Sequence, residues 1–448
     1  MSDIRTVAFV ATASVCILAA FAAGCRREAG EVPSTRPAAS PPAASKPAEG
    51  VAADVCRAAL AWFDKAIASD AVGKMVPAAE AAAERFIAGG SLLAAGNGGF
   101  ADEMFYRAGG FPFTYVWREE LPDDNDVVVI GLYRPDADGF EWSLSGAKAR
   151  EDTFGRAMIV HFAGHGWPLV KSLVRRQGGK APDARLHMFD TGAPAGKGIE
   201  AECVGQLATT ALAWAFHGEV IAAATRKGKM LATFASDWEP DGLEWDQSVL
   251  DHHVHPTCKV PPIAAGEIGT RYLKACRQQV ADFLATQIPQ VRLAAGRLAH
   301  CLKRGGRVWL VSQGHIHARG STVPPALPRV INAGREGQWR WESGDADKGD
   351  VVVWMGYLRY PADQAEDVLR IGADLVSISV DAGVNDERRV HIFGCWKDYD
   401  TVVELPKYPI RVLPSSGVVQ TAQWYAILGE ALAAYRGEPS ATAPAPDK

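Results

Sequence analysis

The first segment whose residue types and spacing suit ligand binding is a glycine-rich turn. The apolar run LLAA gives way at once to four turn residues, Gly96, Asn97, Gly98 and Gly99. Where such a turn joins a parallel strand to a helix, its backbone N–H groups and the positive end of the helix dipole can hold an anion. A lone Gly-rich loop is a weak signal, so a ligand cradle and a plain tight turn both stay open.

A second polar turn, SQGHIHARG (312–320), offers contacts of the same kind. Its imidazoles could meet an anion or a metal, and a guanidinium matches the geometry of a phosphate. The predicted ligand contacts here are Gln313, Gly314, His315, His317 and Arg319. The alternative is a polar turn that caps a helix.

Two polar residues interrupt the apolar segment AWAFHGEVIAA, and they are the candidates for proton transfer. Glu219 and His217 are the best available acid or base for chemistry beside a carbonyl. Two positions apart on a helix, they point in different directions and do not easily act as a pair. The alternative is a buried or inter-domain hydrogen-bonding role.

The segment DHHVHPTC (251–258) is the most metal-like by composition, with His252, His253, His255 and Cys258. Tetrahedral zinc sites draw ligands from separated segments, and this spacing fits no common zinc pattern. We expect a His-rich linker here, and we predict no metal and no cofactor.

The chain repeats itself, which organises the elements that must position these residues. Residues 71–99 align with residues 287–315 at a constant offset of 287 − 71 = 216, each copy reading as helix, Gly-Gly break, short apolar strand and polar turn. Asp126-Val-Val-Val recurs at Asp350-Val-Val-Val, at an offset of 350 − 126 = 224. Further strand-like runs follow in both copies, AMIVHF (157–162) and DLVSISV (374–380).

Strands that alternate with helices predict parallel sheets covered on both faces. The fold class is therefore α/β: two three-layer αβα domains arranged as a pseudo-dimer within one chain. Each half closes with an apolar helix, and the second one follows Pro414 with Ser415 and Ser416, good N-cap residues that we also predict to contact a ligand. Binding is expected at the carboxyl ends of the strands.

The predicted domain boundaries follow from this repeat. Residues 51–234 form the first domain, residues 235–269 a proline-punctuated linker and residues 270–437 the second domain, with a disordered-looking tail at 438–448. Of 448 residues, 48% are hydrophobic and the net charge is −5. Without a Lys/Arg block, this composition argues against a nucleic-acid surface. Six cysteines of the body lack CxxC spacing and define no disulfide framework, although one or two bridges stay open.

The first residues resemble a secretory signal peptide. An uncharged run from Val7 to Gly24 ends in small residues directly before Cys25, as in a bacterial lipoprotein, although Ala22 stands where Leu is usual. Residues 1–25 are therefore predicted to be a signal with a lipidated Cys25, and the Pro/Ala-rich residues 26–50 a flexible tether. The protein would be exported and face the periplasm or cell exterior. A retained membrane anchor and ordinary cleavage are the alternatives.

The segment AGGSLLAAGNGGFADEMFYRAGG resembles the first strand, loop and helix of a sugar isomerase (SIS) domain, especially of the phosphoheptose isomerase type. The likeness extends to DVVVIGLYRP, to the repeats at 305–317 and 350–361, and to GKMLATFAS with VPPIAAGEIGTRYL, altogether about residues 51–437. It implies a tandem SIS-domain protein whose partner is a small sugar derivative. Whether the chain also pairs with itself stays open.

This chain departs from the pattern of the family where hydroxyls and proton-transfer groups are usual. Phe100 replaces the Ser or Thr after the glycines, and Tyr106 and Gly110 stand at the family's His and Glu positions. The first expectation is therefore a phosphosugar or amino-sugar binder with doubtful catalysis. An active aldose–ketose isomerase and a non-binding scaffold are the alternatives.

Overall fold

The computed structural model describes residues 49–97, 99–117, 122–133, 157–164, 186–194, 196, 198–312, 327, 329–332, 346–357, 359–396 and 400–437. Contacts between residues divide the chain into Met1–Pro47 and Ala48–Lys448. Every element below belongs to the second unit. The predicted signal peptide, Cys25 and most of the predicted tether lie outside the described residues.

The first sheet is built from five parallel strands. They are β1 (Leu92–Gly96), β2 (Thr114–Val116), β3 (Val127–Leu132), β4 (Met158–Ala163) and β5 (Leu186–Asp190), and their order across the sheet is β2-β1-β3-β4-β5. All six residues of β3 are buried. A central parallel strand is apolar throughout because both of its faces are covered.

The second sheet repeats this plan. Its strands are β6 (Val308–Ser312), β7 (Val330–Asn332), β8 (Val351–Met355), β9 (Asp374–Ser379) and β10 (Arg389–Phe393), all parallel, in the order β7-β6-β8-β9-β10. A hairpin of β11 (Thr401–Val403) and β12 (Val412–Pro414) is added after β10. Counted from the first strand of each half, the two orders are identical, which confirms the predicted doubled α/β fold.

The registers match the offsets expected from the sequence. Leu92 of β1 pairs with Val127 of β3, and Val308 of β6 pairs with Val351 of β8. These pairs differ by 308 − 92 = 216 and 351 − 127 = 224. The alignment of the sequence with itself therefore matches structurally equivalent residues along β1 and β6 and along β3 and β8.

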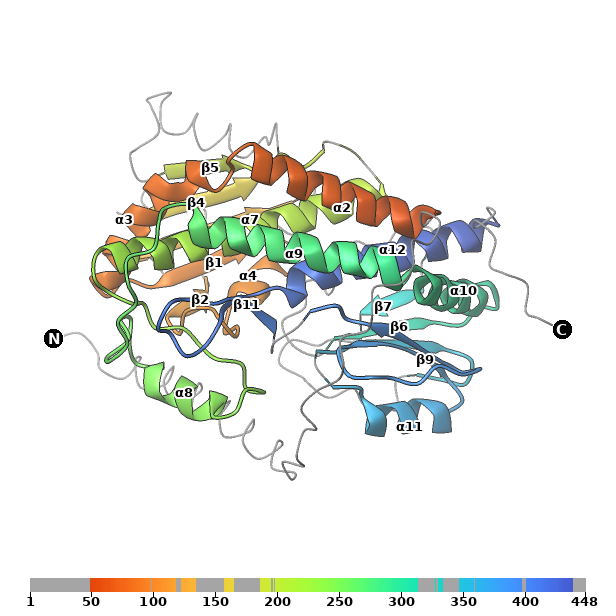
Figure 1. Cartoon of the computed structure of the whole chain (residues 1–448). Helices are drawn as coiled ribbons and strands as arrows, with labels where there is room; N and C mark the ends of the chain where they lie inside the picture. The colour runs from red at the N-terminus through yellow and green to blue at the C-terminus, as the bar shows by residue number, and fades with distance from the viewer. Residues whose placement is uncertain are drawn as a thin grey trace. The chain divides into compact units, whose positions relative to one another are not determined.

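Helices surround the sheets (Figure 1). They are α2 (Val51–Ala68), α3 (Val76–Ile87), α4 (Phe100–Met104) and α7 (Ile199–Arg226) in the first half, α8 (Gly242–Val249) in the connector, and α9 (Glu267–Thr286), α10 (Ile288–Lys303), α11 (Ala362–Arg370) and α12 (Ser416–Arg436) in the second half; a 3-10 turn, η1 (Gly73–Met75), precedes α3. Helix α9 begins inside the predicted 235–269 linker. On α10 the buried positions Val291, Ala295 and Leu298 recur at helical spacing and face the core.

The long helices α7 and α12 form the centre of the molecule and hold the two halves together. Helix α7 packs on α3 of its own half and on α9 of the other; α12 packs on α10 of its own half and on α2 of the other. Helices α2 and α9 also pack side by side against them (Figure 1). This reciprocal packing is what a two-fold interface between identical subunits would show, so the two halves form a pseudo-dimer.

Burial explains the unusual composition of α7. Among the described residues it is the one helix long and apolar enough to cross a membrane, and that whole stretch is buried inside the protein. Every residue from Cys203 to Thr225 is buried. A helix that is apolar all round is expected at the core of a large protein. The six described cysteines have free thiols.

Glycines allow the helices of the two halves to cross closely. A Cβ on Gly218 of α7 would lie 2.6 Å from Ile268 Cγ2 and 2.9 Å from Leu413 Cδ1. A Cβ on Gly269 of α9 would lie 2.9 Å from the carbonyl oxygen of Ala215. In the second half, a Cβ on Gly429 of α12 would lie 2.8 Å from a methyl of α2. The close approach therefore occurs twice, once in each half.

We expect Gly218→Ala to destabilise the protein by about 1–3 kcal/mol, because the added methyl overfills a packed crossing. Gly296→Ala on α10 is the matched control: its Cβ would meet nothing within 4 Å, and a helical Gly→Ala change should stabilise by about 0.5–1 kcal/mol. Urea unfolding of the full chain measures both. Effects of the same sign would contradict a tight crossing at Gly218.

Candidate functional site

The first Gly-rich turn is shaped by close packing of its own backbone. Gly96 has φ 152° and Gly99 has φ 78°, both in the region that favours glycine. A Cβ on Gly96 would lie 2.2 Å from the carbonyl oxygen of Gly131, and a Cβ on Gly131 would meet the ring of Phe100 at 2.3 Å. Phe100, found where the family has a hydroxyl, fills the space beneath β3 instead of facing a ligand.

The described polar groups of this turn bond within the protein. The backbone nitrogen of Asn97 donates to Gly131 O at 3.2 Å, and the backbone nitrogen of Phe100 donates to Asn97 O at 3.2 Å. The side chain of Asn97 accepts from the backbone nitrogen of Tyr133 at 3.1 Å. These contacts tie the end of β1 to the end of β3. Gly98 lies outside the described residues, as do Gln313, Gly314, His315, His317 and Arg319 of the second turn.

Glu219 caps a helix of the other half. Its Oε2 accepts from the backbone nitrogen of Gly266 at 2.7 Å and its Oε1 from that of Gly269 at 2.9 Å, at the start of α9. A carboxylate at a helix N-terminus satisfies donors that have no partner within the helix. Burial raises the pKa of Glu219, and these two N–H donors oppose that rise. The structure thus places Glu219 in the inter-domain hydrogen-bonding role that was the alternative to proton transfer.

The cap is repeated by symmetry. Gly429-Glu430 of α12 corresponds to Gly218-Glu219 of α7, and Glu430 Oε2 accepts from the backbone nitrogen of Ala52 at 3.0 Å, at the start of α2. Each half therefore sends a glutamate from its long helix to the first helix of the other half. The repeated Gly-Glu pair was the sequence signal for this role.

His217 lies apart from Glu219 and is fully buried. Its Nδ1 is 3.0 Å from the carbonyl oxygen of Ala213, and its ring stacks on Phe111 with centroids 5.0 Å apart. Burial lowers the pKa of His217 to about 4, so the ring is neutral at physiological pH. The structure does not bring His217 and Glu219 together as an acid–base pair.

The His-rich segment of the connector is part of the packing. His255 Nδ1 accepts from the backbone nitrogen of Cys258 at 3.0 Å, and His253 stacks on Phe113 with centroids 4.5 Å apart. Leu231 and Val254 form an antiparallel bridge. Within the described residues, no group of three or more His, Cys, Asp or Glu side chains is arranged to hold a metal ion.

A buried ionic cluster joins the halves at the carboxyl ends of β1 and β8. Arg107, just after α4 in the first half, donates from Nη2 to Asp400 Oδ2 at 2.8 Å and to Ser416 Oγ at 2.7 Å. Tyr357, two residues beyond β8, donates its hydroxyl to Asp400 Oδ2 at 2.8 Å. Ser415 and Ser416, predicted to contact a ligand, instead direct their backbone N–H groups at Asp400 Oδ1, at 3.1 and 2.5 Å.

Glu103 is the second carboxyl of this cluster. Its side chain is fully buried, its Oε1 lies 3.6 Å from Arg107 Nε, and neither oxygen has a hydrogen bond among the described residues. A Cβ on Gly417 would lie 2.2 Å from Glu103 Oε1, so the carboxyl is pressed against the first turn of α12. Burial raises the pKa of Glu103 to about 8, against the opposing effect of Arg107. A carboxyl that keeps its proton near neutral pH is of the kind used in acid–base chemistry.

Sequence reasoning missed Glu103, Arg107, Tyr357 and Asp400. Tyr357 could have been found, since the 224-residue offset pairs it with Tyr133. Arg107 is a lone charge within the aromatic and glycine-rich stretch MFYRAGG. Asp400 belongs to the added hairpin region, which has no copy in the first half, so the repeat gave no signal for it.

Two open grooves lie away from this cluster. One, of about 590 Å³, is lined by Arg304, Arg307, Arg329 and Lys348 with Asp347 and Asp350, at the amino ends of β6, β7 and β8. The other, of about 720 Å³, lies between the connector and the β11–β12 hairpin and includes Trp245 and Tyr408. The first groove is at the wrong edge for a ligand of an open parallel sheet, which binds at the carboxyl ends.

Comparisons with known proteins give structural neighbours only: no family model and no curated protein matches the chain. The C-terminal domain of glucosamine-fructose-6-phosphate aminotransferase from Francisella tularensis is 14% identical with a TM-score of 0.44, covering 85% of this chain and 97% of that one. A proposed phosphosugar isomerase from Silicibacter pomeroyi is 10% identical with a TM-score of 0.45, covering 87% and 99%. A proposed sugar binding protein from Salmonella typhimurium is 10% identical with a TM-score of 0.45, covering 85% and 98%.

The two halves share one strand order, which makes the chain a doubled α/β fold. The structural neighbours are of the sugar isomerase kind that the sequence resembles. What those proteins bind or catalyse is a property of theirs. The function of this chain has to come from its own residues.

Glu219→Gln should lower stability by about 1–2 kcal/mol, because the amide loses the charge that favours the cap of α9. Glu267→Gln is the matched control at the same helix end. Glu267 forms a solvent-exposed pair with Arg271 at 3.5 Å, so its loss should change stability by no more than about 0.5 kcal/mol. Denaturant unfolding separates the two. Equal small effects would show that the Glu219 cap contributes little.

Glu103 should make stability fall as pH rises. Its folded pKa of about 8 exceeds the ordinary 4.5, so between these values the folded state keeps a proton that the unfolded state releases. The contribution is fully present below about pH 4.5 and lost by about pH 8. Glu103→Gln mimics the protonated form, so its stability relative to the parent should increase between pH 5 and pH 8. Unfolding curves at both pH values measure this, and a constant difference would contradict a raised pKa.

Proposed function

We propose that this chain binds a phosphosugar or amino sugar at the carboxyl ends of the first sheet and does not isomerise it. Open parallel sheets bind ligands at this edge, and in the first half it is formed by the Asn97 turn and Tyr133. The sugar isomerase-like fold supports the ligand class. Neither Glu219 nor His217 is placed as a base for aldose–ketose chemistry.

The difference between the two halves is the observation that carries this proposal. The second half presents the start of α12 to Asp400, a carboxylate of its own chain. The corresponding connection in the first half, residues 191–198, contains Lys197 and no Asp or Glu. Within this connection the sequence therefore offers no carboxylate in the position of Asp400 to compete with an anionic ligand. Its closing helix begins with Glu200 and Glu202 in the first turn, which favours a ligand that also carries an amino group.

An isomerase is the second candidate, and Glu103 is the observation that favours it. This carboxyl has a pKa of about 8 and lies in the helix that follows the Gly-rich turn. In its deprotonated form a carboxyl with a raised pKa is a stronger base than an ordinary glutamate, and removal of a proton beside a carbonyl requires such a base. Its complete burial against α12 argues for a structural role, which is why binding without turnover is preferred.

Thermal unfolding of the full chain with glucosamine 6-phosphate, fructose 6-phosphate and inorganic phosphate tests the proposal. A ligand that binds only the folded state raises the melting temperature in proportion to the logarithm of its concentration. We expect a logarithmic rise in melting temperature with glucosamine 6-phosphate, a smaller one with fructose 6-phosphate and the smallest with phosphate alone. If none of the three gives a logarithmic rise, the non-binding scaffold is the remaining role.

Solvent deuterium exchange into the same sugars tests the isomerase alternative. Proton abstraction beside the carbonyl places deuterium from the solvent on carbon even when net turnover is slow. We expect none above a no-protein control. Deuterium incorporation that disappears in Glu103→Gln would replace the binding proposal with an isomerase in which Glu103 is the base.

We also propose that the protein is exported and tethered through a lipidated Cys25. The support is the uncharged Val7–Gly24 run before that cysteine and the Pro/Ala-rich residues that follow. Mass measurement of the mature N-terminus in a bacterial host is the test. An acylated N-terminal cysteine is the expected result, and an intact Met1 or an unmodified cleaved terminus would exclude the tether.

A further inference from the structure

We infer that the start of α12 is an oxyanion site, assembled from both halves and filled by the chain's own Asp400. Removal of that carboxylate should open the site to a free oxyanion such as inorganic phosphate. This inference does not rest on the proposed sugar ligand. It depends on the contacts around Asp400.

The carboxylate of Asp400 is held as a bound anion would be. Oδ1 accepts from the backbone nitrogens of Ser415 and Ser416, at 3.1 and 2.5 Å. Oδ2 accepts from Arg107 Nη2, Tyr357 OH and Ser416 Oγ, each at 2.8 Å. Backbone amides at a helix start, a hydroxyl and a guanidinium are the donors that proteins use for phosphate.

The donors come from separate parts of the fold. Arg107 belongs to the first half, Tyr357 follows β8, and the two serines begin α12. Because α12 has 21 residues, its N-terminal amides carry the full effect of the helix dipole. The site is therefore complete only when the two halves are packed together.

Burial makes the site costly to leave empty. The side chains of Arg107 and Asp400 are 3% and 0% exposed. A buried guanidinium that loses its counter-charge costs several kcal/mol, whereas an exposed one is solvated by water. Glu103 is also within 3.6 Å of Arg107, and its two unpartnered buried oxygens face the same start of α12. An anion at this position therefore stabilises the folded protein.

The backbone of Asp400 points to the same conclusion. Its φ is 80°, which is uncommon for a residue with a side chain. Such a conformation persists when surrounding contacts hold it. Here they are the contacts of the carboxylate together with those of the Asp400 carbonyl oxygen, which accepts from the backbone nitrogen of Ser415 at 3.0 Å. Asp400→Gly removes the carboxylate while allowing the same backbone, so it is the variant of choice.

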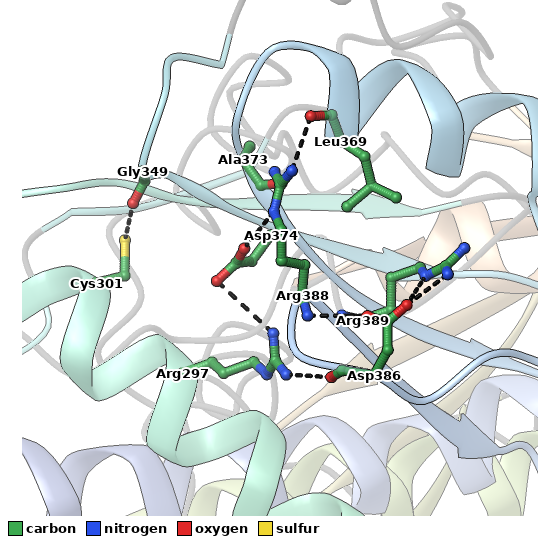
Figure 2. Close-up of polar contacts among 9 residues, drawn as sticks. All are labelled: Arg297, Cys301, Gly349, Leu369, Ala373, Asp374, Asp386, Arg388 and Arg389. Carbon is green, nitrogen blue, oxygen red and sulfur yellow. Dashed lines mark hydrogen bonds and ion pairs between the residues drawn. The ribbon is translucent and has the colours of Figure 1, made fainter.

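Asp386 provides a matched control in the same half (Figure 2). Its Oδ1 accepts from the backbone nitrogens of Arg388 and Arg389, at 2.9 and 2.8 Å, and its Oδ2 accepts from Arg389 Nε at 2.7 Å. The Arg389 guanidinium lowers the pKa of Asp386 to about 2. The donors are alike, but this loop is open to water, so removing the carboxylate leaves no buried charge.

The experiment compares the melting temperatures of the parent, Asp400→Gly and Asp386→Gly full chains over a titration of sodium phosphate. Potassium chloride at matched ionic strength corrects for screening, and the parent curve corrects for the general stabilising effect of phosphate. We expect Asp400→Gly to melt lower than the parent without phosphate and to regain most of the loss with the logarithmic dependence on phosphate concentration that a binding site gives. The parent and Asp386→Gly should show only the same rise, in proportion to the phosphate concentration.

Several results would overturn the inference. A phosphate response of Asp400→Gly no larger than that of the parent would show that no oxyanion site exists there. A logarithmic response of the parent would show that Asp400 does not fill the site. If Asp400→Gly does not fold, its refolding yield with and without phosphate replaces the melting curve, and equal yields would count against the site. Sugar binding by the first half can succeed or fail independently of all three.

Discussion

The structure depends on two long helices that are buried on every side. Helices α7 and α12 each contact their own half and the opposite half, and a residue larger than Gly at 218 or 429 would push α7 away from α9 or α12 away from α2. Close packing of this kind excludes water, so a charged group in the interface requires a partner within the protein. The two glutamates that follow these glycines meet that requirement by capping the first helix of the other half.

The same requirement explains the Asp400 cluster. Where the start of α12 meets α4, three ionisable side chains are withdrawn from water together. Arg107 is balanced by Asp400, and Glu103 is held protonated near neutral pH by its burial. The cluster is thus near electrical neutrality with one ion pair and one uncharged acid. The Asp400 cluster thus contributes to cohesion between the halves.

Much of the fold could be predicted from the sequence, because the repeat carries register information. The 216- and 224-residue offsets fix which strands correspond, and apolar runs such as Val127–Leu132 identify central parallel strands. The site was predicted less well. Gly96 and Gly99 were correctly seen as a turn, but the glycines serve backbone packing against Gly131, a contact distant in sequence. Asp400 could not be foreseen, since which buried carboxylate meets the start of α12 depends on the path of an inserted hairpin.

Fusion of the two halves into one chain has a consequence for how they can diverge. In a homodimer every substitution appears on both sides of the two-fold axis. A change at the carboxyl edge of one sheet therefore alters the same edge of the other sheet as well. Here Leu428 occupies the place that His217 has in the first half, and the 394–415 connection carries a hairpin that 191–198 lacks. Covalent linkage therefore lets one copy acquire a contact such as the Asp400 cluster without its twin having to accommodate the same change.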